Sequence, residues 1–184
     1  MTENQRSIII QEFINEAELA AATTEIIPAN AVALNASLMA VTQNEELVLF
    51  AEPEDVNPEL FSEFRVNPKV VTKPTKEQLS TVRCGVTDAF GAVAATGSVC
   101  VAVSKGLASP ISMLTRKHIV VLDSETIVQR PRNVLSEKFL DGKGLRRNYS
   151  IITGTSATAD MGPLVRGVHG PGELHIIILS GNDR

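Results

Sequence analysis

The chain is poor in the features that mark several protein classes. It has only Cys84 and Cys100 as cysteines among 184 residues, too few for a disulfide scaffold or for the thiolates that hold an iron–sulfur cluster. It has no apolar run of about 18 residues, so no transmembrane helix is expected. Its first residues lack a basic region followed by a hydrophobic stretch, so no secretory signal is expected either. These absences favour a cytoplasmic protein.

Basic charge is also scarce. The formal net charge is -4 and the isoelectric point is about 5.4. Because nucleic-acid binding usually needs a basic face, no nucleic-acid partner is expected. The histidines stand at no zinc spacing from either cysteine, so no metal site is expected. A phosphate loop, a dinucleotide fingerprint and a nucleophile elbow are all missing from the sequence.

The length favours one domain over residues 1–184. A helical N-terminal extension over residues 1–22 is the alternative considered for its start. Hydrophobic spacing predicts helices at 11–22, 30–41, 60–64, 75–82 and 134–140, and a turn at 141–144. It predicts strands at 23–27, 46–51, 70–71, 98–103, 117–122, 150–153 and 174–179. Because helices and strands alternate and the later strands are continuous apolar runs, the predicted class is α/β, with a mostly parallel sheet flanked by helices.

Hydroxyl-bearing side chains follow the strand at 150–153. The loop Thr153-Gly-Thr-Ser-Ala-Thr158 offers hydroxyls and free amides at the expected start of a short helix, which suits a phosphate or carboxylate. Parallel α/β proteins build ligand sites at the carboxyl ends of their strands. The alternative is an ordinary turn whose hydroxyls cap a helix.

Other candidate groups have equally plain alternatives. Gly97, in Ala95-Thr-Gly-Ser98, either contributes to a site or permits a tight bend. Asp88 is interpreted as a turn aspartate or a buried polar anchor. His169, on a Gly/Pro-rich loop, either titrates near a ligand or bonds to the backbone. His118 and His175 lie within strands and are interpreted as satisfied core or face residues.

Three stretches resemble the LUD (lactate utilisation) domain family, typified by the bacterial lactate utilisation protein C. Gly85–Ser98 is similar to the family's Gly-Ile-Thr…Ala-Glu-Thr-Gly-Ser/Thr segment, and Lys117–Leu122 to its His-Ile-Val strand. Residues 153–160, 167–171 and 174–179 resemble its Thr-Gly-Pro-Ser-x-Thr-Ala-Asp-Ile-Glu, Gly-Val-His-Gly-Pro and His-Val-x-Leu ending. The closing match is specific, and the likeness covers residues 80–180 well but residues 1–80 in general layout alone.

The resemblance implies a fold like that of ribose-5-phosphate isomerase, glucosamine-6-phosphate deaminase and the CoA transferases. It also implies a role beside iron–sulfur subunits in oxidising L-lactate, with no cofactor in this chain. The first hypothesis is therefore an accessory subunit that binds an anionic small molecule, with His169 as the candidate catalytic group. The predicted binding residues are Thr96, Gly97, Ser98, Thr153, Gly154, Thr155, Ser156, Thr158, Asp160 and His169.

Two departures from the family pattern bear on activity. Ala95 stands where the family has an acidic residue before Thr-Gly, and Met161-Gly162 replaces the Ile-Glu that follows Ala-Asp. If those carboxylates are catalytic, this chain is a divergent or inactive member. The alternatives are a stand-alone enzyme on a sugar phosphate or CoA thioester, and an interaction module with a vestigial pocket. Because small α/β domains often self-associate, a homo-oligomer is also considered.

Overall fold

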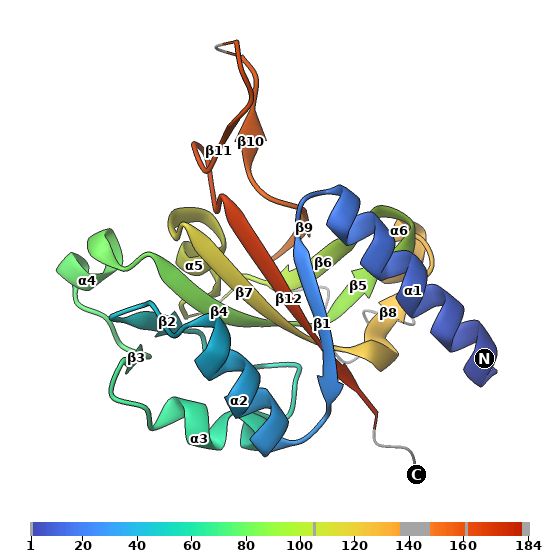
Figure 1. The fold of residues 1–184 in the computed structure, drawn as a ribbon, viewed down its shortest axis with the longest axis horizontal. Coiled ribbons are helices and arrows are strands. Elements are labelled where there is room, and N and C mark those ends of the chain that lie inside the picture. The colour runs from blue at the N-terminus through green and yellow to red at the C-terminus, as the bar shows by residue number, and fades with distance from the viewer. Residues whose placement is uncertain (1, 105, 137–147, 161, 182–184) are drawn as a thin grey trace.

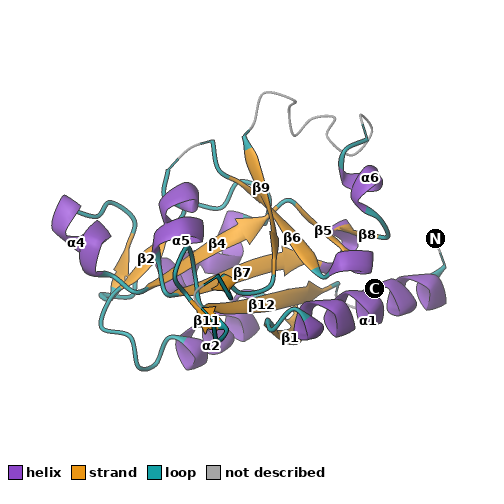
Figure 2. Ribbon diagram, turned by 90° about the horizontal axis from the view of Figure 1, so that it is seen from above, coloured by secondary structure: helices purple, strands orange, loops and turns teal. Residues whose placement is uncertain are grey.

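The computed structural model describes residues 2–104, 106–136, 148–160 and 162–181. Its centre is a six-stranded sheet with helices on both faces (Figures 1 and 2). Every neighbouring pair in this sheet is parallel, which confirms the predicted class. In spatial order the strands are β1 (Thr23–Pro28), β12 (Glu173–Ser180), β7 (Lys117–Asp123), β4 (Cys84–Ala89), β2 (Val48–Phe50) and β3 (Val70–Val71).

Each face of the sheet has its own apolar layer. Val120 and Ile176 pack with helices α1 and α5, whereas their chain neighbours Ile119 and Ile177 pack with α2 and α3. Both faces are therefore buried, which is why these strands read as unbroken apolar runs. The helical elements are α1 (Glu3–Leu19), α2 (Ala31–Val41), η1 (Pro58–Phe61), α3 (Ser62–Arg65), α4 (Lys76–Thr81), η2 (Ala94–Thr96), α5 (Ala108–Leu114), η3 (Ser124–Thr126) and α6 (Pro131–Val134).

A second, four-stranded sheet packs over the α1 and α5 side of the first. Its order is β8-β5-β6-β9, and both β5 and β9 run antiparallel to β6. The strand predicted at 150–153 is β9, so its expected place in a parallel layout is wrong. Residues 124–128 turn away from β7, through η3 into β8. The bounds are β5 (Gly91–Val93), β6 (Ser98–Ala102), β8 (Ile127–Val128) and β9 (Tyr149–Thr153).

Helix α1 begins earlier than the predicted helix at 11–22. Thr2 caps it, because its hydroxyl accepts the Gln5 amide while the Gln5 side chain returns a bond to the Thr2 backbone. The helix ends at Leu19, and Ala21 then takes a left-handed conformation with φ 66°. Phe13 is fully buried in the core, so α1 is packed into the domain along the buried side of the second sheet. Within the described ranges, no helix is both long enough and apolar enough for a membrane span.

Most other predicted elements are found close to their expected bounds. Asn30 caps α2 through the Ala33 amide, and Thr75 caps α4 through the Gln78 amide. The helix predicted at 134–140 is wrong over its described part, because α6 spans Pro131–Val134 and ends where the predicted helix begins. Residues 137–147, with the turn predicted at 141–144, lie outside the described residues. After β9 the chain forms a hairpin of β10 (Ala157–Thr158) and β11 (Val165–Arg166), which projects from the body in Figure 1.

Candidate functional site

The two predicted walls of the site lie side by side. Ser98 and Thr153 are direct partners on the antiparallel strands β6 and β9, and their hydroxyl oxygens are 2.7 Å apart. Thr96 extends the chain of hydroxyls, with its Oγ1 2.7 Å from Ser98 Oγ. Ser98 is 2% exposed, whereas Thr96 and Thr153 are open to solvent. Since each hydroxyl carries one proton and the three share two short bonds, one proton remains, and the Thr96 carbonyl oxygen, 3.5 Å from Ser98 Oγ, is its acceptor within the protein.

Two glycines fix these loops against the end of α1. Gly97 has φ 59°, and a Cβ there would lie 2.2 Å from the Ala17 amide nitrogen. Gly154 has φ 63°, and a Cβ there would lie 1.9 Å from the Ala20 carbonyl oxygen. Any side chain at either position would meet helix backbone, in a conformation that favours glycine. The close approach to α1 therefore explains both glycines, and their contact with a ligand stays a prediction.

Three amides of the 153–160 loop that were expected as free donors are engaged within the protein. Thr155 donates to the Ala20 carbonyl at 3.3 Å, and Ser156 donates to the Pro171 carbonyl at 2.8 Å. The Asp160 amide reaches Thr158 Oγ1 at 3.3 Å. The loop leads into the β10–β11 hairpin rather than the expected short helix. A ligand at this loop would be held mainly by hydroxyls.

The loop that carries His169 neighbours the 153–158 loop, as predicted. Gly167 donates its amide to the Ser156 carbonyl at 2.8 Å, and a Cβ on Gly170 would lie 3.3 Å from Ser156 Cβ. His169 and Asp160 are both exposed. Because β12 begins after this loop and β9 lies in the second sheet, the cluster sits at the amino edge of the parallel sheet. The expected position at a carboxyl edge is therefore wrong.

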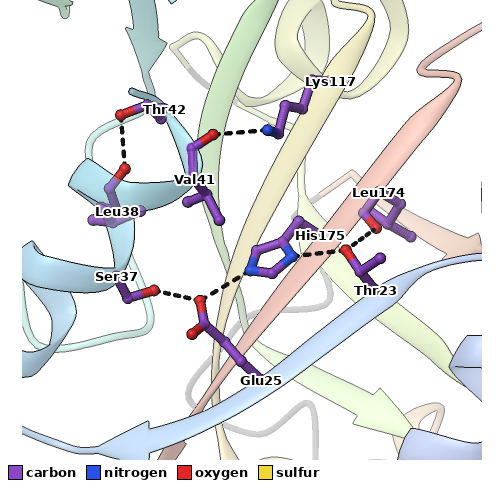
Figure 3. Close-up of polar contacts among 9 residues, drawn as sticks. All are labelled: Thr23, Glu25, Ser37, Leu38, Val41, Thr42, Lys117, Leu174 and His175. Atoms are coloured by element: carbon purple, nitrogen blue, oxygen red, sulfur yellow. Dashed lines mark hydrogen bonds and ion pairs between the residues drawn. The ribbon is translucent and has the colours of Figure 1, made fainter. Parts of the chain in front are cut away.

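His175 is fully bonded on the sheet surface, in line with its interpretation as a satisfied strand residue (Figure 3). Its Nε2 lies 2.9 Å from Glu25 Oε1, and its Nδ1 lies 2.7 Å from Thr23 Oγ1. Ser37, on α2, donates its hydroxyl to the same oxygen of Glu25. The network joins β1, β12 and α2. Thr23 and Glu25 were not among the predicted residues, although polar residues two apart in a strand share a face.

His118 lies in the core between β4 and β12. Its Nε2 is 2.8 Å from Thr87 Oγ1, and its Nδ1 has no hydrogen-bond partner among the described residues. Burial lowers the pKa of this imidazole to about 3, so the ring is neutral at physiological pH. The burial agrees with the interpretation of His118 as a core residue, whereas the unpartnered Nδ1 disagrees with the expectation that the ring is satisfied.

The cysteines have the environment of structural thiols. Cys84 and Cys100 are both free and buried, in separate apolar clusters. Burial raises the pKa of each thiol to about 12, so both stay protonated near neutral pH. In the described ranges, no group of three or more His, Cys, Asp or Glu residues is arranged to hold a metal ion.

Comparisons with known proteins agree with this architecture. The model of the LUD domain family matches residues 15–179. A crystal structure of a DUF162 family protein from Deinococcus radiodurans superposes with a TM-score of 0.70, covering 95% of this chain and 98% of that chain. Its sequence is 20% identical, so it supports the fold alone. A comparison with curated proteins finds no match. With a family match over most of its length, the chain belongs to the LUD domain family, whose name refers to lactate utilisation.

Proposed function

We propose that this chain is an accessory subunit in the oxidation of L-lactate or a related organic acid, where it binds the anionic small molecule. In that reaction L-lactate gives up two electrons and two protons to become pyruvate, and iron–sulfur clusters in partner subunits take the electrons. The proposal places the complex in the cytoplasm, where free thiols such as those of Cys84 and Cys100 persist.

The observation that carries the proposal is the Thr96–Ser98–Thr153 hydroxyl cluster, which joins two segments far apart in the sequence. In place of its long bond to the Thr96 carbonyl, the remaining hydroxyl proton can be donated to a carboxylate oxygen of the ligand. The exposed oxygens of Thr96 and Thr153 can accept the α-hydroxyl of L-lactate. Ser156 and His169, on the adjoining loops, are the proposed further contacts.

The clusters belong to the partners in this proposal because this chain's cysteines do not suit them. Cys84 and Cys100 are buried, and the pKa of each thiol is raised to about 12, whereas a cluster ligand must be a thiolate. The chain's contribution is then to bind and orient the substrate anion beside a partner that accepts electrons.

Calorimetric titration with L-lactate, pyruvate and D-lactate tests the binding role directly. We expect L-lactate or pyruvate to bind, and Thr153→Val to weaken that binding at least about tenfold, equivalent to about 1.4 kcal/mol. Ser150→Ala, on the same strand but on its other face, is the matched control and should keep wild-type affinity. Equal affinity in wild type and Thr153→Val would refute a hydroxyl-held anion.

The catalytic role of the whole system needs a second readout. Purified iron–sulfur partners with reconstituted clusters would be mixed with L-lactate, with and without this chain, and cluster reduction followed by absorbance. We expect lactate-dependent bleaching only when this chain is present. Bleaching at the same rate without the chain would exclude it from the reaction.

The projecting hairpin favours the interaction module as a second candidate. Leu164 is 62% exposed, Val165 45% and Val168 51%, so exposed apolar side chains gather on the hairpin and just after it. In this alternative the hairpin docks onto the iron–sulfur partner, and the hydroxyl cluster binds nothing. Leu164→Asp would then abolish binding to the purified partner, while Thr153→Val would leave it unchanged.

A further inference from the structure

A hydroxyl, an imidazole and a carboxylate are linked in series across strands β1 and β12 (Figure 3). Thr23 Oγ1 lies 2.7 Å from His175 Nδ1, and His175 Nε2 lies 2.9 Å from Glu25 Oε1. A hydroxyl bonded to a base, with the base oriented by a third group, is the arrangement that activates a hydroxyl as a nucleophile. The strand register produces it, because Thr23 pairs directly with His175, and Glu25 lies two residues further along the same face.

The carboxylate determines which nitrogen of the ring is the base. An ionised carboxylate only accepts hydrogen bonds, so the neutral imidazole carries its proton on Nε2, toward Glu25. Its Nδ1 then has a free lone pair, which accepts the hydroxyl proton of Thr23. Ser37 donates its hydroxyl to the same oxygen of Glu25 and so holds the carboxylate in place. His175 is therefore oriented as a general base toward Thr23.

The hydroxyl is accessible, whereas the base behind it is covered. Thr23 is exposed, so a small molecule in solution can reach its oxygen. The His175 side chain is 14% exposed and is bonded through both nitrogens, which gives the ring one orientation. The Leu174 carbonyl is a second acceptor for the Thr23 proton, but at 3.4 Å it competes poorly with the nitrogen at 2.7 Å. The Thr23 proton is thus directed at the imidazole.

The next residue of β1 offers an internal comparison. Thr24 points to the opposite face of the strand, where it donates its hydroxyl to Glu18 Oε1 at 2.8 Å. A carboxylate is a weaker base than a neutral imidazole, so it takes up a hydroxyl proton less readily. The two adjacent threonines therefore separate a hydroxyl bonded to an imidazole from one bonded to a carboxylate.

We propose that Thr23 is a nucleophile that accepts a short acyl group from an activated ester or thioester, with His175 as its general base. Thr23 Oγ1 attacks the acyl carbon while His175 Nδ1 takes the hydroxyl proton. The bond to the alcohol or thiol then breaks, and that leaving group takes the proton from the ring. The products are an ester at Thr23 and a free alcohol or thiol.

Water completes the reaction by the same route. It attacks the Thr23 ester, with His175 again taking and returning the proton, and this step releases the carboxylic acid and restores the hydroxyl. Because a methyl group stands on the same carbon as the Thr23 hydroxyl, short unbranched acyl chains fit best. Glu25 is a positioning residue that acts through the ring. This activity does not rest on lactate binding.

The probe is p-nitrophenyl acetate, with acid-quenched samples digested and analysed by mass spectrometry. Peptide analysis separates acetylation of Thr23 from that of lysine side chains, which the ester also modifies. We expect an acetyl group on Thr23, and His175→Gln should slow its formation at least about a hundredfold, the lower end of the contribution of a general base. Thr23→Ser keeps a hydroxyl and should retain the modification, whereas Thr23→Val should abolish it. Thr24→Val is the matched control and should leave the acetylation of Thr23 at the wild-type rate.

Glu25→Gln tests the positioning role, because it keeps an acceptor for His175 Nε2 but removes the charge. We expect it to lower the maximal rate of Thr23 acetylation while the ester concentration at half-maximal rate stays the same. The urea midpoint of each variant checks that it is folded. Acetyl groups on lysines alone, or equal acetylation of Thr23 in wild type and folded His175→Gln, would overturn the proposal.

Discussion

Lowering the pH should destabilise the fold through His118. In the unfolded chain the imidazole takes up a proton near its ordinary pKa of 6.5, whereas burial holds the folded pKa at about 3. Between these values the unfolded state binds more protons, so stability falls as the pH is lowered from about 6.5 towards 3. Above pH 6.5 the ring is neutral in both states, so burial of His118 causes no loss of stability there.

The size of this loss of stability follows from the difference between the assay pH and the pKa of the ring in the unfolded chain. A pH of 4.5 is about two units below that pKa, while the folded ring is still neutral. At about 1.4 kcal/mol per unit, the expected loss relative to pH 8 is about 2.7 kcal/mol. This figure depends little on the folded pKa, provided that it stays below about 4.5. Asp88 acts with the opposite sign, because its carboxyl pKa is raised by burial.

Urea denaturation at pH 8, 6.5, 5.5 and 4.5 would measure this loss in wild type and in the double variant Thr87→Val/His118→Leu. Replacing both members of the hydrogen-bonded pair leaves neither polar group buried alone. We expect the variant to lose about 2.7 kcal/mol less than wild type between pH 8 and 4.5, and the effect of Asp88 cancels in the difference. His169→Gln, which changes an exposed ring, should follow wild type. Parallel acid profiles of wild type and the double variant would refute the reasoning.

Three other predictions concern packing. Gly154→Ala should lower the free energy of unfolding by about 3 kcal/mol or more, because its Cβ would meet the Ala20 carbonyl at 1.9 Å; an unchanged urea midpoint would contradict this. Phe13→Ala should cost about 3–5 kcal/mol by the same assay if α1 is part of the core, and less than about 1 kcal/mol if it is a detachable extension. Cys84 and Cys100 should resist an aromatic disulfide reagent in the native protein and react in urea, since burial raises both thiol pKa values to about 12.

The parallel sheet could be predicted because its central strands are buried on both faces. Ile119–Leu122 and Ile176–Leu179 are apolar at every position, a pattern typical of such strands. The second sheet was missed because β5 consists of Gly91, Ala92 and Val93, which show neither alternation nor a turn pattern. Small buried residues carry little local signal, so their pairing with β6 and β8 depends on the tertiary structure.

That the segments of the candidate site lie close together could be predicted from the sequence, but their hydrogen bonds could not. Residues 96–98 and 153–158 were predicted to belong to one binding site, and the Ser98–Thr153 pairing places them side by side. The engaged amides could not be foreseen, because Ser156 bonds to the carbonyl of Pro171 across the base of the hairpin. The Thr23–His175 contact likewise depends on the register between two parallel strands distant in sequence.

Gly97 and Gly154 pack against the end of α1, so the position of that helix fixes the two loops of the proposed binding site. A helix advances about 100° per residue, so a one-residue slip would turn Ala17 and Ala20 away from the two glycines. The hydroxyls of the two loops would then lose their common alignment while the parallel sheet kept its pairing. If the proposed site binds its ligand, sequence changes in α1, which carries none of the proposed ligand contacts, would therefore change the affinity.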